Sequence, residues 1–218
     1  MGCGPSTPEA PPQAAPAPAA APAAPAAPSA EEVQALVEGF QAGYWNGKAV
    51  EMCTADAQFN APGAPPMRIA DMLGMVAPAK EAFPDWASLT HGAEPNDDGT
   101  WTVLTQQCCG AMQADLGAMG PFPAVALADA DEKAKQDCKF PVEVGTYTLR
   151  QEDGAWKIQS GAFAGETRAV DGAEVSPDID AMWNKNGDLS DVGFGAMFLL
   201  MGITLPPAPP AGGEGEAQ

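Results

Sequence analysis

The sequence has little positive charge. It carries 10 lysine and arginine residues against 29 aspartate and glutamate residues, which gives a formal net charge of -19. Nucleic acids and bare anionic membranes both present dense negative charge and would repel such a chain. We therefore expect no nucleic-acid partner.

Metal-binding motifs are also absent. The chain has 5 cysteines, none in a CxxC spacing, and its single histidine is His91. A structural zinc site needs about four cysteine or histidine ligands, so we predict no metal, and we predict no other cofactor. The cysteines are expected to be free and mostly buried thiols in a reducing compartment. Cys108 and Cys109 should point to opposite faces if they lie on a strand.

Long apolar segments are missing as well. No apolar run follows the start in the manner of a secretory signal peptide. The longest such run, Val192 to Leu205, is interrupted by glycines and is shorter than the ~20 residues that a spanning helix needs. We expect a cytoplasmic protein that is not secreted and does not cross a membrane.

The composition divides the chain of 218 residues into three parts. Residues 1–30 are rich in proline and alanine and cannot bury a core, so they should form a disordered spacer. Residues 31–170 have the alternating and helical patterns of one domain. Residues 171–218 are expected to be an extension with short helices, from Ser176 and from Phe194, and a disordered tail.

The first six residues, Met1 to Ser6, fit the pattern M-G-x-x-x-[ST], in which Gly2 receives a myristoyl chain. Cys3 stands beside it and is a candidate for palmitoylation. One myristate binds a membrane only marginally, whereas two acyl chains anchor a protein durably. We therefore expect a membrane surface as a partner through Gly2 and Cys3. The alternative is that this short pattern arose by chance.

Two helical segments are predicted in the domain. Ser29 and Glu32 form a capping box, so a helix should begin there and end near Asn46-Gly47. Its apolar stripe consists of Val33, Leu36, Val37, Phe40 and Tyr44. A short helix over residues 48–53 should follow. A second apolar stripe from Ile69 to Val76 predicts another helix, which Pro78 should weaken.

The strands are predicted from alternation and turn residues. They fall near residues 58–60, 86–94 and 101–112, and a long loop over 114–136 is expected to be a functional lid. Cys138 to Phe163 should form a hairpin around Glu152-Asp153-Gly154. Neither face of its first strand is wholly polar, so this strand should lie centrally in a curved sheet that is covered on both sides.

The order of these elements resembles the NTF2-like superfamily, and particularly its SnoaL-like branch. The residues that carry the resemblance are Tyr44-Trp45-Asn46-Gly47, Asp56 to Gly63, Phe83-Pro84-Asp85, Gly145-Thr146-Tyr147 and Glu152 to Ile158. The resemblance implies an α+β cone, in which N-terminal helices close a strongly curved, mostly antiparallel sheet around a pocket. Such a pocket is a usual place for small ligands.

Enzymes of that family generally use an Asp and a His inside the cone for acid/base chemistry. Asp85 and His91 are the catalytic candidates here, although an Asp in such a turn can equally brace the backbone. Gly110-Ala111-Met112 stands where cyclase-like members often have Gly-x-His. The residues expected to line a ligand pocket are Tyr44, Trp101, Met112, Tyr147 and Trp156.

Three functions remain as alternatives. The first is binding of a small, largely apolar molecule by a membrane-tethered cone. The second is an isomerase, dehydratase or cyclase that uses Asp85 or His91 with a tyrosine. The third is a non-catalytic module that forms homodimers through its sheet, because one scaffold hosts many functions.

Overall fold

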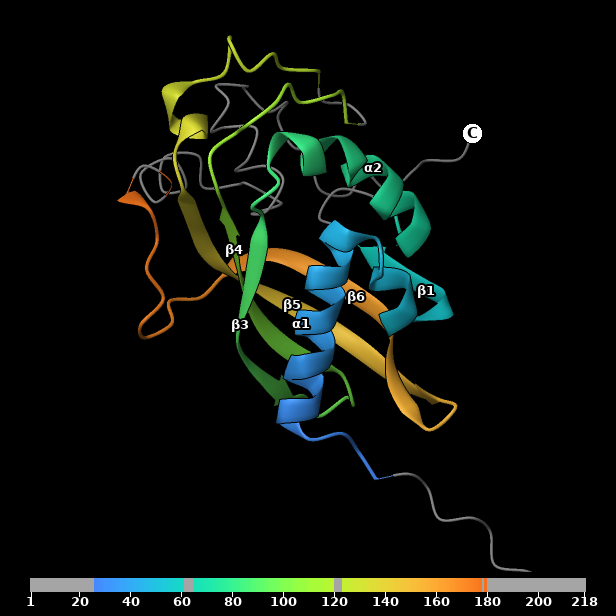
Figure 1. The fold of residues 1–218 in the computed structure, drawn as a ribbon. Coiled ribbons are helices and arrows are strands. Elements are labelled where there is room, and N and C mark those ends of the chain that lie inside the picture. Colours follow the sequence, from blue (N-terminus) through green and yellow to red (C-terminus); the bar gives the residue numbers. More distant parts are fainter. Residues whose placement is uncertain (1–25, 61–64, 120–122, 178, 180–218) are drawn as a thin grey trace, which may run out of the picture.

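A computed structural model describes residues 26–60, 65–119, 123–177 and 179. A bent sheet is covered on one face by helix α1, and helix α2 lies at one end of it (Figure 1). The elements in chain order are α1 (Ala30–Asn46), the 3-10 turn η1 (Ala49–Met52), β1 (Cys53–Asn60), β2 (Met67–Arg68), α2 (Ile69–Ala82), β3 (Ala87–Pro95), β4 (Trp101–Cys109), the 3-10 turn η2 (Glu132–Lys135), β5 (Cys138–Glu152) and β6 (Ala155–Thr167).

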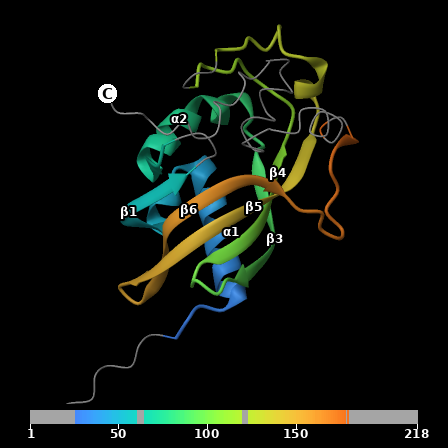
Figure 2. The same ribbon diagram turned by 180° about the vertical axis from the view of Figure 1, so that it is seen from behind.

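The six strands lie in the order β2-β1-β6-β5-β4-β3. Strands β3 to β6 pair with their sequence neighbours in antiparallel fashion, whereas β1 joins β6 in parallel. The view from behind shows β5 and β6 in front of α1, so this helix lies against one face of the sheet (Figure 2). This α+β architecture confirms the predicted bent, mostly antiparallel sheet that N-terminal helices cover, with β5 in its interior.

Helix α1 begins at the predicted capping box. The Ser29 hydroxyl accepts from the Glu32 amide at 3.2 Å, and the Glu32 carboxylate accepts from the Ser29 amide at 2.8 Å. Gly47 ends the helix with φ 81°, a left-handed conformation that favours glycine. Buried side chains of the predicted stripe, Val33, Val37, Phe40 and Tyr44, face the sheet.

The predicted hairpin is also confirmed. Asp153 and Gly154 connect β5 to β6, with φ values of 52° and 82°. Positive φ at both central residues is typical of a type I′ turn, which matches the twist of antiparallel strands. The local sequence therefore sets the register at the turn end of this hairpin.

Two boundaries differ from the prediction. Strand β4 ends at Cys109 rather than Met112, because the amides of Met112 and Gln113 donate to Ala134 and Ala82 instead of to a strand. The short helix after α1 is a 3-10 turn, and β1 already begins at Cys53. Helix α2 contains Pro78 and ends at Ala82, directly before Phe83-Pro84-Asp85, as predicted.

Aromatic side chains fill the space between α1 and the sheet. The face of the sheet toward α1, called the inner face, carries Trp101, Val103 and Tyr147 in one buried cluster with α1. Phe40 of α1 stacks on Phe59 of β1 with ring centroids 5.0 Å apart. The interior between α1 and these strands is thus a packed core.

Residues 168–177, called the strap, cover part of the opposite, outer face. The Arg168 amide donates to the Val142 carbonyl at 2.9 Å, and the Ser176 amide donates to the Lys139 carbonyl at 3.0 Å. Between these two points, Val170 and Ala173 pack on apolar residues of the sheet, namely Leu104, Val142 and Val144. The strap thereby forms hydrogen bonds with the part of β5 that does not pair with β6.

Several sequence-based predictions concern residues outside the described ranges. They include the acylation of Gly2 and Cys3, the N-terminal spacer and the helix from Phe194. Within the described residues, no helix has the length and apolar character needed to span a bilayer.

Candidate functional site

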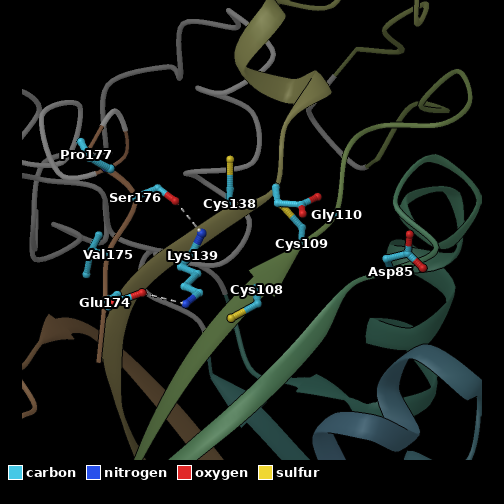
Figure 3. Close-up of a pocket in the computed structure, with 11 residues that line it drawn as sticks. Asp85, Cys108, Cys109, Gly110, Cys138, Lys139, Glu174, Val175, Ser176 and Pro177 are labelled. Carbon is cyan, nitrogen blue, oxygen red and sulfur yellow. Dashed lines mark hydrogen bonds and ion pairs between the residues drawn. The ribbon is translucent and has the colours of Figure 1, made fainter. Parts of the chain in front are cut away.

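A pocket of about 600 Å³ lies where β4 ends and β5 begins (Figure 3). We call it the end pocket. Strand ends, the strap and the turn before β3 supply its walls, which consist of Asp85, Cys108, Cys109, Gly110, Asp137, Cys138, Lys139, Glu174, Val175, Ser176 and Pro177. Small-molecule sites in proteins commonly have volumes of roughly 300 to 1,000 Å³. The end pocket is therefore large enough for a small organic molecule.

Cysteines form much of the inner wall of the end pocket. Cys109 lies directly opposite Cys138 in the β4–β5 ladder, and Cys108 is paired with Lys139. Cys109 and Cys138 belong to a buried apolar cluster, whereas Cys108 is half-buried on the other face. The prediction that Cys108 and Cys109 point to opposite faces is confirmed, and all cysteines in the described ranges are free thiols.

These thiols are held in the neutral form. A hydrogen bond with the Cys138 thiol and burial both raise the pKa of Cys109. Burial also raises the pKa of Cys108, although the nearby Lys139 ammonium lowers it in part. Neutral cysteine behaves as a small apolar side chain, so this wall suits an apolar ligand surface.

Lys139 provides the polar edge of the end pocket. Its Nζ lies 3.1 Å from the Glu174 carboxylate, and half of its side chain is exposed. Its backbone amide donates to the Ser176 hydroxyl at 3.0 Å, which fixes the strap against β5. Asp85 and Asp137 line the same pocket. The acidic surroundings disfavour an anionic ligand and leave Lys139 able to donate to a neutral oxygen.

Asp85 contacts the segment after β4 at the edge of this pocket. Its carboxylate accepts from the Gln113 side chain at 2.9 Å. A Cβ atom at Gly110 would lie 2.8 Å from the Asp85 Cβ, so only glycine fits there without movement. These contacts tie the turn before β3 to the segment after β4. A role of Asp85 in bracing its own helix-to-strand turn stays a prediction.

His91 lies on an irregularity of the edge strand β3, between the paired residues Thr90 and Gly92. Its Nε2 is 3.1 Å from the Gln106 Oε1 atom. Asp85 lies in the turn before β3 and lines the end pocket, whereas His91 lies within β3 and does not line it. The structure therefore does not bring the two catalytic candidates together, and a catalytic role for either stays a prediction.

The five residues expected to contact a ligand lie elsewhere. Tyr44, Trp101 and Tyr147 are buried in the core under α1, and Met112 is buried in the cluster near the end of α2. Trp156 is half-buried at the start of β6. None of them lines the end pocket, so ligand contact by these residues stays a prediction.

The inner face carries a row of polar side chains that was not predicted from the sequence. Thr90, Thr105 and Glu143 are register partners across β3, β4 and β5. Glu143 is only 3% exposed, and the hydroxyls of the two threonines are buried without a hydrogen-bond partner among the described residues. Side chains alternate between the two faces of a strand, so Tyr147, Gly145 and Glu143 lie on the same, inner face. The sequence of the hairpin could therefore have predicted that Glu143 is buried.

The phenol of Tyr147 lies close to this row. Burial raises its pKa, the Gln41 side chain partly offsets this, and the Glu143 carboxylate raises it further. A buried carboxylate beside a phenol is a pair of groups that can exchange protons with a ligand, if a ligand reaches them.

Comparisons with known proteins concern only the fold. No family model matches the sequence, and no curated protein matches it. A putative hydroxylase from Streptomyces galilaeus has 16% identity and a TM-score of 0.42, with 62% of this chain and 79% of that chain covered. An NTF2-like protein from Novosphingobium aromaticivorans has 15% identity and a TM-score of 0.41, with 70% and 86% covered. We draw nothing about ligand or reaction from likenesses at this level.

Proposed function

We propose that this α+β cone of NTF2-like fold binds a small, largely apolar molecule that carries a neutral oxygen acceptor. The observation that supports this function is the end pocket, whose volume of about 600 Å³ suits such a molecule. The thiol wall and the side chains of Val175 and Pro177 accept the apolar part. The Lys139 ammonium donates to the oxygen.

A pair of matched ligands and a pair of matched variants test this proposal. The ligands are α-tetralone, a bicyclic ketone, and tetralin, which has a similar skeleton without the oxygen. We expect saturable binding of α-tetralone at one site, and binding of tetralin that is about fivefold weaker because one hydrogen bond is lost. Calorimetric titration of the full chain measures both.

The variant Cys108→Trp should fill the end pocket and weaken α-tetralone binding by about tenfold or more. Thr102→Trp is the control, because Thr102 lies on the same face of β4 but does not line the pocket. Equal binding by the two variants would contradict the proposal. So would a lack of saturable binding by α-tetralone and by a wider panel of lipids and polyketides.

A second candidate function is acid/base catalysis by Glu143 in place of Asp85 or His91. It is favoured by the position of this buried carboxylate beside the Tyr147 phenol and opposite Thr105. If the protein has this function, we expect it to convert a bound ligand into a product, and we expect Glu143→Gln to abolish this conversion. Turnover that survives in Glu143→Gln would dismiss this residue.

The N-terminal anchor belongs to the same proposal. Acylation of Gly2 and Cys3 would hold the cone at a membrane surface through a spacer of proline and alanine. Intact mass of the full chain made in a eukaryotic cell should show loss of Met1 and addition of a C14 acyl group. An unmodified Gly2 would remove the anchor, and formation of homodimers through the sheet stays a separate prediction.

A further inference from the structure

The end of β4 and the start of β5 place two thiols next to each other. Cys109 and Cys138 are direct partners in the antiparallel register. They are 4% and 7% exposed, and the neighbouring Cys138 thiol raises the pKa of Cys109. The Cys138 thiol also donates to the backbone carbonyls of Gln136 at 3.5 Å and Lys133 at 3.8 Å. Figure 3 shows both side chains at the wall of the end pocket. The fold thus forms a dithiol from residues that lie on two different strands.

The register meets the geometric needs of a disulfide. Directly opposite residues in an antiparallel pair have Cα atoms about 4.5 or 5.5 Å apart, depending on the hydrogen-bonding of the pair. Both values fall within the roughly 4.4 to 6.8 Å that disulfides span. Cys108 is a poorer partner for Cys138, because it points to the opposite face and is paired with Lys139.

The end pocket gives a small reagent access to the pair. Its volume of about 600 Å³ adjoins the sulfur-bearing residues Cys108, Cys109 and Cys138. The other described cysteine, Cys53, is buried in the core under α1 and does not line this pocket. Reaction with a small oxidant should therefore begin at the pocket cysteines.

We propose that Cys109 and Cys138 form a redox-modification site, which a low-molecular-weight disulfide converts into a disulfide between β4 and β5. One thiolate attacks a sulfur of the reagent, forms a mixed disulfide and releases one reagent thiol. The second protein thiolate then attacks the protein sulfur of the mixed disulfide and releases the second reagent thiol. Two electrons pass from the protein to the reagent, and the two protein protons end on the released thiols.

The environment of the pair sets the rate of this reaction. Only the thiolate attacks, and the hydrogen bond between the thiols together with burial keeps Cys109 protonated. The dithiol is consequently a slow site at neutral pH. Below the pKa of the attacking thiol, its thiolate fraction and the initial rate should rise about tenfold for each unit of pH.

Oxidised glutathione and the folded full chain provide the test. After incubation between pH 7 and pH 9 and alkylation of the remaining thiols, peptide mass spectrometry without reduction should find one link, between Cys109 and Cys138. Among Cys53, Cys108, Cys109 and Cys138, the number of free thiols should fall from 4 to 2. Cys108→Ala and Cys53→Ala should keep the link, whereas Cys109→Ala and Cys138→Ala should lose it.

A second measurement does not depend on the folding of a variant. Phenylarsine oxide bridges two neighbouring thiols, and one equivalent should bind the folded wild-type chain and block the glutathione reaction. A link that contains Cys108, mixed disulfides alone, or no reaction at pH 9 would overturn the proposal. These readouts do not require ligand binding, so the proposal stands or falls independently of the proposed function.

Discussion

Replacement of Gly43 by alanine should lower the free energy of unfolding by about 3 kcal/mol. Gly43 is buried in α1, where the helix meets the 3-10 turn η1. A Cβ atom there would lie 2.6 Å from the backbone nitrogen of Ala49 and 2.9 Å from its Cα atom. Because backbone atoms cannot rotate away as a flexible side chain can, either α1 or η1 must move.

Helix propensity acts in the opposite direction, since alanine is favoured over glycine in a helix by about 1 kcal/mol. Gly74→Ala isolates that term, because no atom lies within 4 Å of a Cβ placed at this position of α2. We expect Gly74→Ala to stabilise the protein and Gly43→Ala to destabilise it, as measured by urea unfolding. Stabilisation by both variants would show that η1 is not packed against α1.

Gln106→Leu is the second substitution with a large expected effect, a loss of about 3 kcal/mol in the free energy of unfolding. Gln106 is 2% exposed, and its side-chain nitrogen donates to the carbonyls of Phe140 and Glu174, each at 2.8 Å. These two bonds connect β4 to β5 and to the strap. Leucine has a similar size but no donor, so both carbonyls would lose this partner.

The same side chain explains the position of His91. Since the Gln106 nitrogen faces two carbonyls, its Oε1 faces His91, whose Nε2 must therefore carry the proton. His91→Ala removes only this contact and should cost less than about 1 kcal/mol. The exposed Gln58 of β1 gives a matched control, Gln58→Leu, which should be nearly neutral.

Amide hydrogen exchange should show which part of the protein Gln106→Leu destabilises. In Gln106→Leu, the amides of Arg168 and Ser176, which bind β5, should lose protection first. Because Glu174 to Pro177 line the end pocket, α-tetralone binding should weaken in the same variant. Unchanged strap protection together with unchanged unfolding would contradict the assigned role of Gln106.

Some site residues could be found from local patterns, and others could not. Strand alternation correctly separated Cys108 from Cys109, and the same alternation places Glu143 beside Tyr147 on the inner face. Asp85 lies in the turn before β3 and His91 lies within β3. Nothing in the sequence indicated that these two residues would not face one pocket, because that depends on where the chain bends. The irregularity at His91 could not be predicted either, because it arises in the pairing of β3 with β4.

Helix caps and tight turns could be predicted from the sequence, because their hydrogen bonds join residues only a few positions apart. Ser29 with Glu32 starts α1, and Asp153-Gly154 turns β5 into β6, because capping and turn geometry depend on neighbouring residues. The pairing of Cys109 with Cys138 and the position of the strap at the end pocket became visible only in the folded structure. Those contacts join segments separated by long stretches of chain, so their register is set by the packing of the whole sheet rather than by any local pattern.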